Sequence, residues 1–214
     1  MAMKFSSVKG QAAKGNTYKY KDGINTLRFF GEVIPMYGYW LKTADGKPIQ
    51  LECLSFDRNQ ERFTNVEKDW VQHYFPEQKC SWSYLAQAID VTDGKVYLIA
   101  LKKKLFQQIL ATADDLGDPT DTTEGWDVVF TKTKTGSMSY NVEYTLSPLK
   151  CKKRALTEAE LAAIAEAPSI DDLKPRMTAD EIKNIIETRI LSNASTEDSD
   201  EAAELAETAD DLAF

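Results

Sequence analysis

The segment SYNVEYTLS alternates apolar and polar side chains with the two-residue period of a β-strand. Its apolar and aromatic residues fall on one face: Tyr140, Val142, Tyr144 and Leu146. Such alternation is typical of an antiparallel strand with one face buried and the other in water. The preceding segment WDVVFTKTKT is rich in β-branched residues, and a Thr-Gly turn signal separates the two. Together they predict a β-hairpin.

Five more β-rich segments precede this hairpin, with Asp-Gly turn signals among them. They are INTLRFFGEVI, YGYWLKT, PIQLECLSF, SWSYLAQAIDV and KVYLIAL. A helix is predicted directly before the hairpin, in KKKLFQQILATADDLG, where Leu105, Ile109 and Leu110 have helical spacing. Several strands with a single helix before the last pair predict a mainly β fold, the oligonucleotide-binding (OB) fold, which is a five-stranded Greek-key barrel. A small β-sandwich would give a similar strand count.

The predicted barrel, residues 18–154, has an extension on each side. Residues 1–17 contain no acid and three lysines, Lys4, Lys9 and Lys14. We predict that this segment is a flexible basic arm, because it buries too little surface to offset the entropy of ordering. Residues 155–192 contain the capping boxes TEAE and TADE, which predict a helical extension. The apolar stripe of its second helix is expected to pack on the barrel.

Acidic residues are concentrated at the C-terminus. Residues 197–214 hold eight Asp and Glu and no Lys or Arg, which accounts for the whole formal net charge of −8. Residues 1–154 carry 22 Lys and Arg against 18 Asp and Glu. We therefore predict a mildly basic body and, at residues 193–214, a disordered acidic tail that ends in Phe214. This asymmetry suggests a polyanion partner or a tail with its own role.

The sequence also indicates the cellular compartment in which the protein is expected. No segment approaches the roughly 20 consecutive apolar residues of a membrane helix, and no apolar run near the N-terminus suggests a signal peptide. The three cysteines are odd in number and widely spaced, which favours reduced thiols over a disulfide framework. We expect a cytoplasmic protein that does not contact a membrane.

Aromatic and cationic residues are interleaved in TYKYK, LRFF, MYGYWLK, KCSWSY and the run KKK. Single-stranded nucleic acid needs this pairing, because unstacked bases lie on aromatic faces at about 1–3 kcal/mol each while cations bind the phosphates. Any one strand aromatic is more often a core residue, so the hypothesis rests on the combination. The predicted nucleic-acid-binding residues are Lys19, Lys21, Arg28, Tyr37, Tyr39, Trp40, Lys42, Trp82, Tyr84, Lys102, Lys103 and Lys104.

A metal site is the weaker alternative. Cys53, His73, Cys80 and Cys151 supply the three thiols and one imidazole that zinc accepts. Their long intervals contain no close pair, so free thiols are favoured and no cofactor is expected. The chain has one histidine, no phosphate-cradling Gly-rich loop and no nucleophile elbow, so we do not expect an enzyme.

Several segments resemble the core of tailed-phage single-stranded DNA-binding proteins, over roughly residues 18–153. They are KDGINTLRFFGEVIP, WVQHYFPEQKCSWSYLAQAID, DGKVYLIALKKKLFQQI, LGDPTDTTEGWDVVFTKTKTG and NVEYTLSPLK. The acidic C-terminus that closes on an aromatic residue is also similar to the tails of such proteins. The resemblance implies an OB fold that coats single-stranded DNA without sequence preference during phage DNA replication, recombination and repair.

The resemblance also implies roles for individual residues. It adds Lys132, Lys134 and Tyr140 to the DNA-binding groove. It implies an arm that supports self-association on DNA, and a tail that recruits replication proteins such as DNA polymerase or primase-helicase through Asp210, Asp211 and Phe214. The chain departs from some members of the family, because its Cys and His residues lack a compact zinc cluster and its arm lacks a contiguous basic motif.

Another class of protein fits the low pI of 4.8. An acidic interaction protein, such as a DNA mimic, would inhibit a nucleic-acid enzyme. A mimic would spread its acids over the folded body, whereas here the body carries a net positive charge. That the protein is a nuclease or a zinc-dependent enzyme is a third and weaker hypothesis.

Overall fold

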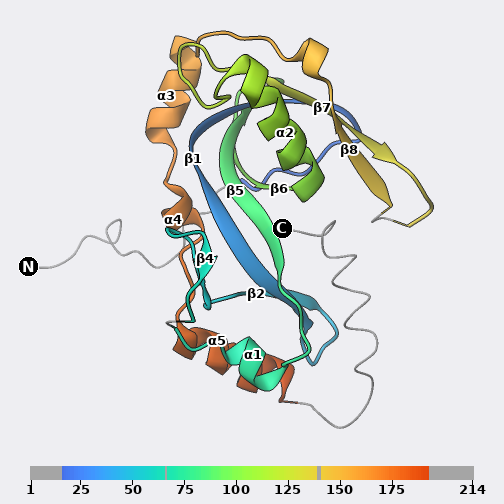
Figure 1. Cartoon of the computed structure of the whole chain (residues 1–214), viewed down its shortest axis with the longest axis vertical. Coiled ribbons are helices and arrows are strands. Elements are labelled where there is room, and N and C mark those ends of the chain that lie inside the picture. Colours follow the sequence, from blue (N-terminus) through green and yellow to red (C-terminus); the bar gives the residue numbers. More distant parts are fainter. Residues whose placement is uncertain (1–15, 66, 139–140, 193–214) are drawn as a thin grey trace, which may run out of the picture.

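An antiparallel sheet of six strands dominates the computed structural model, which describes residues 16–65, 67–138 and 141–192 (Figure 1). The strands are β1 (Gly23–Lys42), β2 (Pro48–Glu52), β5 (Ser81–Asp90), β6 (Val96–Leu101), β7 (Val128–Lys134) and β8 (Val142–Leu146). Five of them lie in the order β6-β5-β1-β7-β8, and β2 pairs with the end of β1. The helix α2 (Lys103–Leu116) precedes the β7–β8 hairpin, as the sequence predicts. The mainly β fold is confirmed.

Strand β1 is 20 residues long and belongs to both halves of the molecule. Its first residues pair with β7, its last residues pair with β2, and β5 pairs with the part between them. The strand has a bulge near Gly31, whose φ of 67° suits glycine, and the register with β5 shifts between Phe30 and Ile34. In Figure 1, α2, β6, β7 and β8 surround the first half, whereas β2, α1 (Trp70–Tyr74) and α5 (Ala179–Ile185) lie around the second.

The sheet differs from the expected closed five-stranded barrel. Its strand order is compatible with an OB-like fold. In the described part of the chain, however, the end strands β6 and β8 do not pair with each other, so the sheet is open, and β2 adds a sixth strand. Local contacts cover the two edges instead. On β6, the backbone of Leu98 bonds to Asn16 and Tyr18 at 2.9 and 2.8 Å. On β8, the side chain of Gln108 from α2 makes hydrogen bonds with the backbone at two positions.

The remaining elements are short. They are β3 (Phe56–Asp57), β4 (Arg62–Phe63), the 3-10 turn η2 (Pro148–Lys150), α3 (Glu158–Glu166), α4 (Ile170–Leu173) and the π-helix η3 (Ile186–Ile190). Among the described residues, no helix combines the length and apolar content that a membrane span requires.

Apolar clusters lie on the sheet in each half of the molecule. The first cluster contains Trp126, which is fully buried, and the α2 residues Leu105 and Ile109. The second cluster joins the end of β1 and β2 to Ile182 and Ile186, which are also buried. The predicted apolar stripe of the helical extension therefore packs on the sheet, at the second half of β1. Both predicted capping boxes are present, at the starts of α3 and α5.

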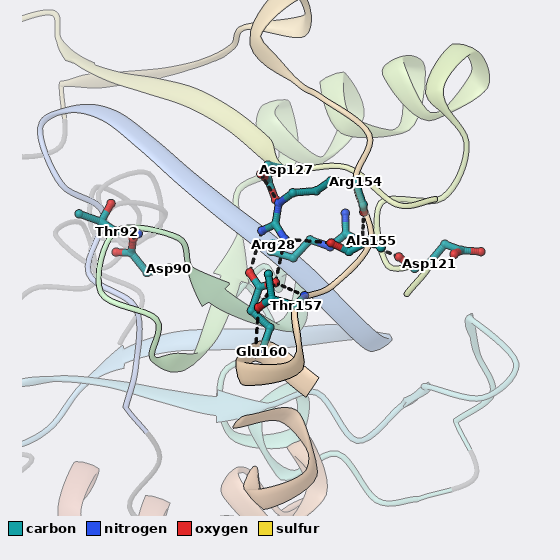
Figure 2. A network of polar contacts seen from close by, with 9 residues as sticks. All are labelled: Arg28, Asp90, Thr92, Asp121, Asp127, Arg154, Ala155, Thr157 and Glu160. Carbon is teal, nitrogen blue, oxygen red and sulfur yellow. Dashed lines mark hydrogen bonds and ion pairs between the residues drawn. The ribbon is translucent and has the colours of Figure 1, made fainter. Parts of the chain in front are cut away.

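A polar network fixes the helical extension to the sheet (Figure 2). The guanidinium of Arg154 donates to Asp127 at 2.8 Å and to both carboxylate oxygens of Glu160, in the first turn of α3, at 2.7 Å. Arg28 of β1 lies in the same network and is fully buried. It donates to the carbonyl oxygens of Asp121 and Arg154 at 2.6 and 3.1 Å. The network thus joins β1, the loop after α2 and the start of α3.

Candidate nucleic-acid interface

Three aromatic side chains form a row on one face of the sheet. Trp82 and Tyr84 are two residues apart on β5 and therefore point to the same face. Their rings meet edge-on with centroids 5.1 Å apart, and Tyr84 stacks on Phe106 of α2 at 3.9 Å. All three side chains are half-buried, so each retains surface that a planar ligand can contact. Tyr37 of β1 lies directly opposite Trp82 in the strand register and is also half-buried.

A lysine run lies beside this row. The ammonium of Lys103 is 5.4 Å from the ring centroid of Trp82, a cation–π contact. Lys102 is the N-cap of α2, its side chain makes no capping hydrogen bond, and the first turn contains no acid. The helix dipole and the first backbone N–H groups add to the positive potential at this end. This combination favours a bound anion such as phosphate.

A cavity of 520 Å³ opens at the same lysines. Its lining residues are Lys102, Lys103, Lys104, Thr135, Val142, Glu143 and Tyr144. Tyr144 packs against Tyr20 with ring centroids 4.8 Å apart, so an aromatic ring forms part of this wall. Because Lys103 belongs to both the aromatic row and the cavity, they form one continuous surface. We call it the lysine–aromatic surface, and it comprises Trp82, Tyr84, Phe106, Tyr144 and the three lysines.

The other predicted lysines do not line the cavity, but in the register of β7 and β8 Lys132 lies opposite Tyr144 and Lys134 lies opposite Val142. Lys19 and Lys134 are exposed, and Lys42 is half-buried. Lys21 forms an ion pair with the buried Asp90, and Lys132 pairs with Asp22 at 3.0 Å. Tyr140, the arm residues Lys4, Lys9 and Lys14, and the tail residues Asp210, Asp211 and Phe214 lie outside the described residues.

Three predicted residues of β1 belong to the interior. Arg28 has no exposed surface, Tyr39 is 1% exposed and Trp40 is 9% exposed. The hydroxyl of Tyr39 donates to the buried carboxylate of Asp69 at 3.0 Å, and burial raises the pKa of Tyr39 well above its usual range. Side chains with so little exposed surface cannot contact a strand of nucleic acid. We therefore leave Arg28, Tyr39 and Trp40 out of the candidate interface.

The chain is similar to a curated protein of Escherichia phage T5 named probable ssDNA-binding protein. The two are 29% identical over 103 residues, which cover 42% of this chain and 40% of the T5 protein. The chain thus matches less than half of its relative's length. No family model matches the chain. The similarity confirms the resemblance to phage single-stranded DNA-binding proteins that the sequence segments indicate.

The four residues of the alternative zinc set do not form a single group. Cys53 is buried in the second cluster with half-buried Cys80, and a hydrogen bond from the Cys80 thiol lowers the pKa of Cys53 to about 7 although burial acts in the opposite direction. Cys151 is buried in the first cluster, and His73 is exposed on α1. Within the described ranges, no group of three or more His, Cys, Asp or Glu is arranged to hold a metal ion.

Another cavity, of 540 Å³, lies beside α1. Its wall includes Glu67, Asp69, Lys68 and His73. With two acids beside a single lysine, this wall does not favour a polyanion. The lysine–aromatic surface is therefore the better candidate for a nucleic acid.

Sequence reasoning missed two members of that surface, Phe106 and Tyr144. Phe106 directly follows the buried Leu105 in a helical pattern, which gives no sign that it faces β5. Tyr144 lies on the apolar face of the alternating segment, where a core position is the ordinary expectation. Contacts of α2 with both β5 and β8 bring the two residues to one surface.

Proposed function

We propose that the protein binds single-stranded DNA at the lysine–aromatic surface without sequence preference. The observation that carries this proposal is the contact of Lys103 with Trp82, beside the stacked pair Tyr84 and Phe106 and open to a cavity lined by lysines. Bases stack on aromatic faces whatever their identity, and lysines neutralise the phosphates between them. The name of the T5 relative, probable ssDNA-binding protein, supports the same function.

We also propose that the protein acts by binding rather than by catalysis, needs no cofactor and serves phage DNA replication, recombination and repair. The acidic C-terminus would compete with DNA for the lysines and be released when DNA binds, because both are polyanions. Its last residues, with Phe214 as an aromatic anchor among carboxylates, would then recruit a replication protein that carries a basic apolar pocket. The basic arm would assist neighbouring molecules on the strand.

Tryptophan fluorescence during titration with oligo-dT tests the proposal. Trp126 is fully buried and Trp40 is 9% exposed, so Trp82 is expected to give most of the quenching. Trp82→Phe should therefore retain an aromatic platform and most of the affinity, measured by anisotropy of labelled oligo-dT, but lose the quenching. Trp70→Phe is the matched control, because Trp70 lies in α1, and it should leave the quenching intact.

Two further measurements complete the test. Affinity should fall steeply as salt rises, and a chain stopped at Thr196 should bind more tightly than the full chain at low salt. If the full and shortened chains both fail to bind at low salt, the proposed function is wrong and a DNA mimic becomes the better hypothesis. If quenching persists in Trp82→Phe but disappears in Trp70→Phe, DNA binds elsewhere on the protein.

A further inference from the structure

An exposed aromatic ring lies on the face of the sheet that carries Trp82 and Tyr84, at the end away from α2. Phe63, in the short hairpin formed by β3 and β4, is 48% exposed. Its ring packs against Tyr37 and Phe56 with centroids 5.0 and 5.3 Å away, and Tyr37 and Phe56 are 4.4 Å apart. Phe56 is buried, so it supports the other two rings from below. Phe63 thus presents an aromatic surface to solvent on a packed base.

This three-ring cluster is continuous with the lysine–aromatic surface. Tyr37 contacts Phe63 on one side and lies opposite Trp82 in the register of β1 and β5. Trp82 contacts Tyr84, which stacks on Phe106. Aromatic side chains therefore follow one another from α2 to the hairpin.

The hairpin is held in place before any ligand arrives. Arg58 lies 2.9 Å from the carboxylate of Glu52 in β2, and these side chains are only 10% and 8% exposed. The guanidinium of Arg176 donates to the carbonyl oxygens of Leu54 and Phe56 at 3.2 and 3.0 Å. A ring on such a support loses little conformational freedom when it binds, and preorganisation of this kind favours affinity.

We infer that Phe63 is a second stacking subsite, which receives a base of a DNA strand that continues from Trp82 past Tyr37 onto the β3–β4 hairpin. This inference rests on the proposed function and deepens it, since it predicts that strand length determines affinity. A short strand would occupy the lysine–aromatic surface alone. A longer strand would reach Phe63 and gain one more stacked base.

The experiment measures the affinity of the full chain for labelled oligo-dT over lengths of about 4 to 16 nucleotides, the range of site sizes known for OB folds. The unaltered protein should bind more tightly as the strand lengthens. Phe63→Ala should leave the affinity for the shortest bound oligonucleotide unchanged and weaken binding of the longer ones by roughly 5- to 150-fold, the loss of one stacked base.

Two substitutions separate stacking from packing. Phe63→Tyr retains a ring and should retain the gain with length, whereas Phe63→Leu retains apolar volume and should lose it. Leu149→Ala is the matched control, because Leu149 is 99% exposed in η2 and belongs to neither surface. Thermal denaturation of each variant should confirm that the fold is intact.

The outcomes are distinguishable. Failure of the unaltered protein to bind at any length would contradict the proposed function itself. Binding by the unaltered protein with the same length dependence in Phe63→Ala would overturn only the second subsite. An equal loss at every length would also overturn it, because Phe63 would then act through the fold or within the first subsite.

Discussion

The substitution Glu160→Gln tests how strongly the polar network of Figure 2 holds the helical extension to the sheet. Hydrogen bonds from Arg154 lower the pKa of Glu160 from 4.5 to about 2, although partial burial acts in the opposite direction. Each pKa unit corresponds to about 1.4 kcal/mol, so lowering the pKa of Glu160 from 4.5 to about 2 is equivalent to at most about 3–4 kcal/mol of unfolding free energy. Solvent reaches Arg154, whose side chain is 28% exposed, and screening reduces the expected loss to roughly 1–2 kcal/mol.

The pH dependence gives the sharper readout. The pKa of Glu160 is lower in the folded state, so its contribution is fully present above pH 4.5 and is lost as the pH falls towards 2. Urea denaturation should therefore separate the unaltered protein from Glu160→Gln near pH 7, and the difference should shrink between pH 4.5 and 2. Glu158→Gln is the matched control, because Glu158 is exposed in the same first turn and should change stability little.

Two results would contradict this reasoning. If Glu160→Gln is as stable as the unaltered protein at pH 7, the ion pair with Arg154 contributes nothing measurable. If the variant is less stable by the same amount at pH 7 and at pH 2.5, the loss does not come from the charge of the carboxylate. It would then come from the capping box, in which Glu160 also accepts a hydrogen bond from the Thr157 backbone.

Two further predictions concern the lysines and the loop after α2. Replacing Lys103 and Lys104 by Gln should reduce the slope of log affinity for oligo-dT against log salt by about 0.7 for each lysine that contacts a phosphate, and an unchanged slope would exclude both lysines from the DNA path. Gly125→Ala should cost about 1–3 kcal/mol of unfolding free energy, measured in urea. The added Cβ would lie 2.3 Å from the carbonyl oxygen of Asp121 and 2.7 Å from the guanidinium of Arg28, and full stability would mean that this loop can move aside.

Local sequence patterns predict much of the fold. The final hairpin, the single helix before it and the two capping boxes all follow from periodicity and cap chemistry, which depend on neighbouring residues. Within the predicted helix, Leu105 and Ile109 are buried, whereas Leu110 is 51% exposed. The sequence also suggests two strands where β1 is continuous, because Pro35 lies between them and proline usually interrupts a strand. In the structure, β1 continues through a bulge next to Gly31, and Pro35 lies opposite Tyr84 in the register with β5.

The candidate interface was less predictable. Trp82, Tyr84 and Lys103 were recognisable as aromatics near cations, and they lie together in the structure. The burial of Arg28 was not predictable, because its carbonyl partners belong to residues 93 and 126 positions away in the sequence. Phe63 gave no signal, since the hairpin that presents it consists of two-residue strands. Tertiary contacts, which local patterns do not encode, decide each of these cases.

The continuity of β1 has a consequence for binding kinetics. One unbroken strand carries Tyr37 and runs between the part of the sheet that packs on α2 and the part that holds the hairpin. The two proposed subsites would therefore act as a bivalent binder with a rigid spacer. Once a DNA strand binds one subsite, its next bases are at a high effective concentration at the other subsite. No flexible linker or hinge between the subsites lowers this effective concentration. Longer DNA strands should then differ from short ones mainly in a slower dissociation rate.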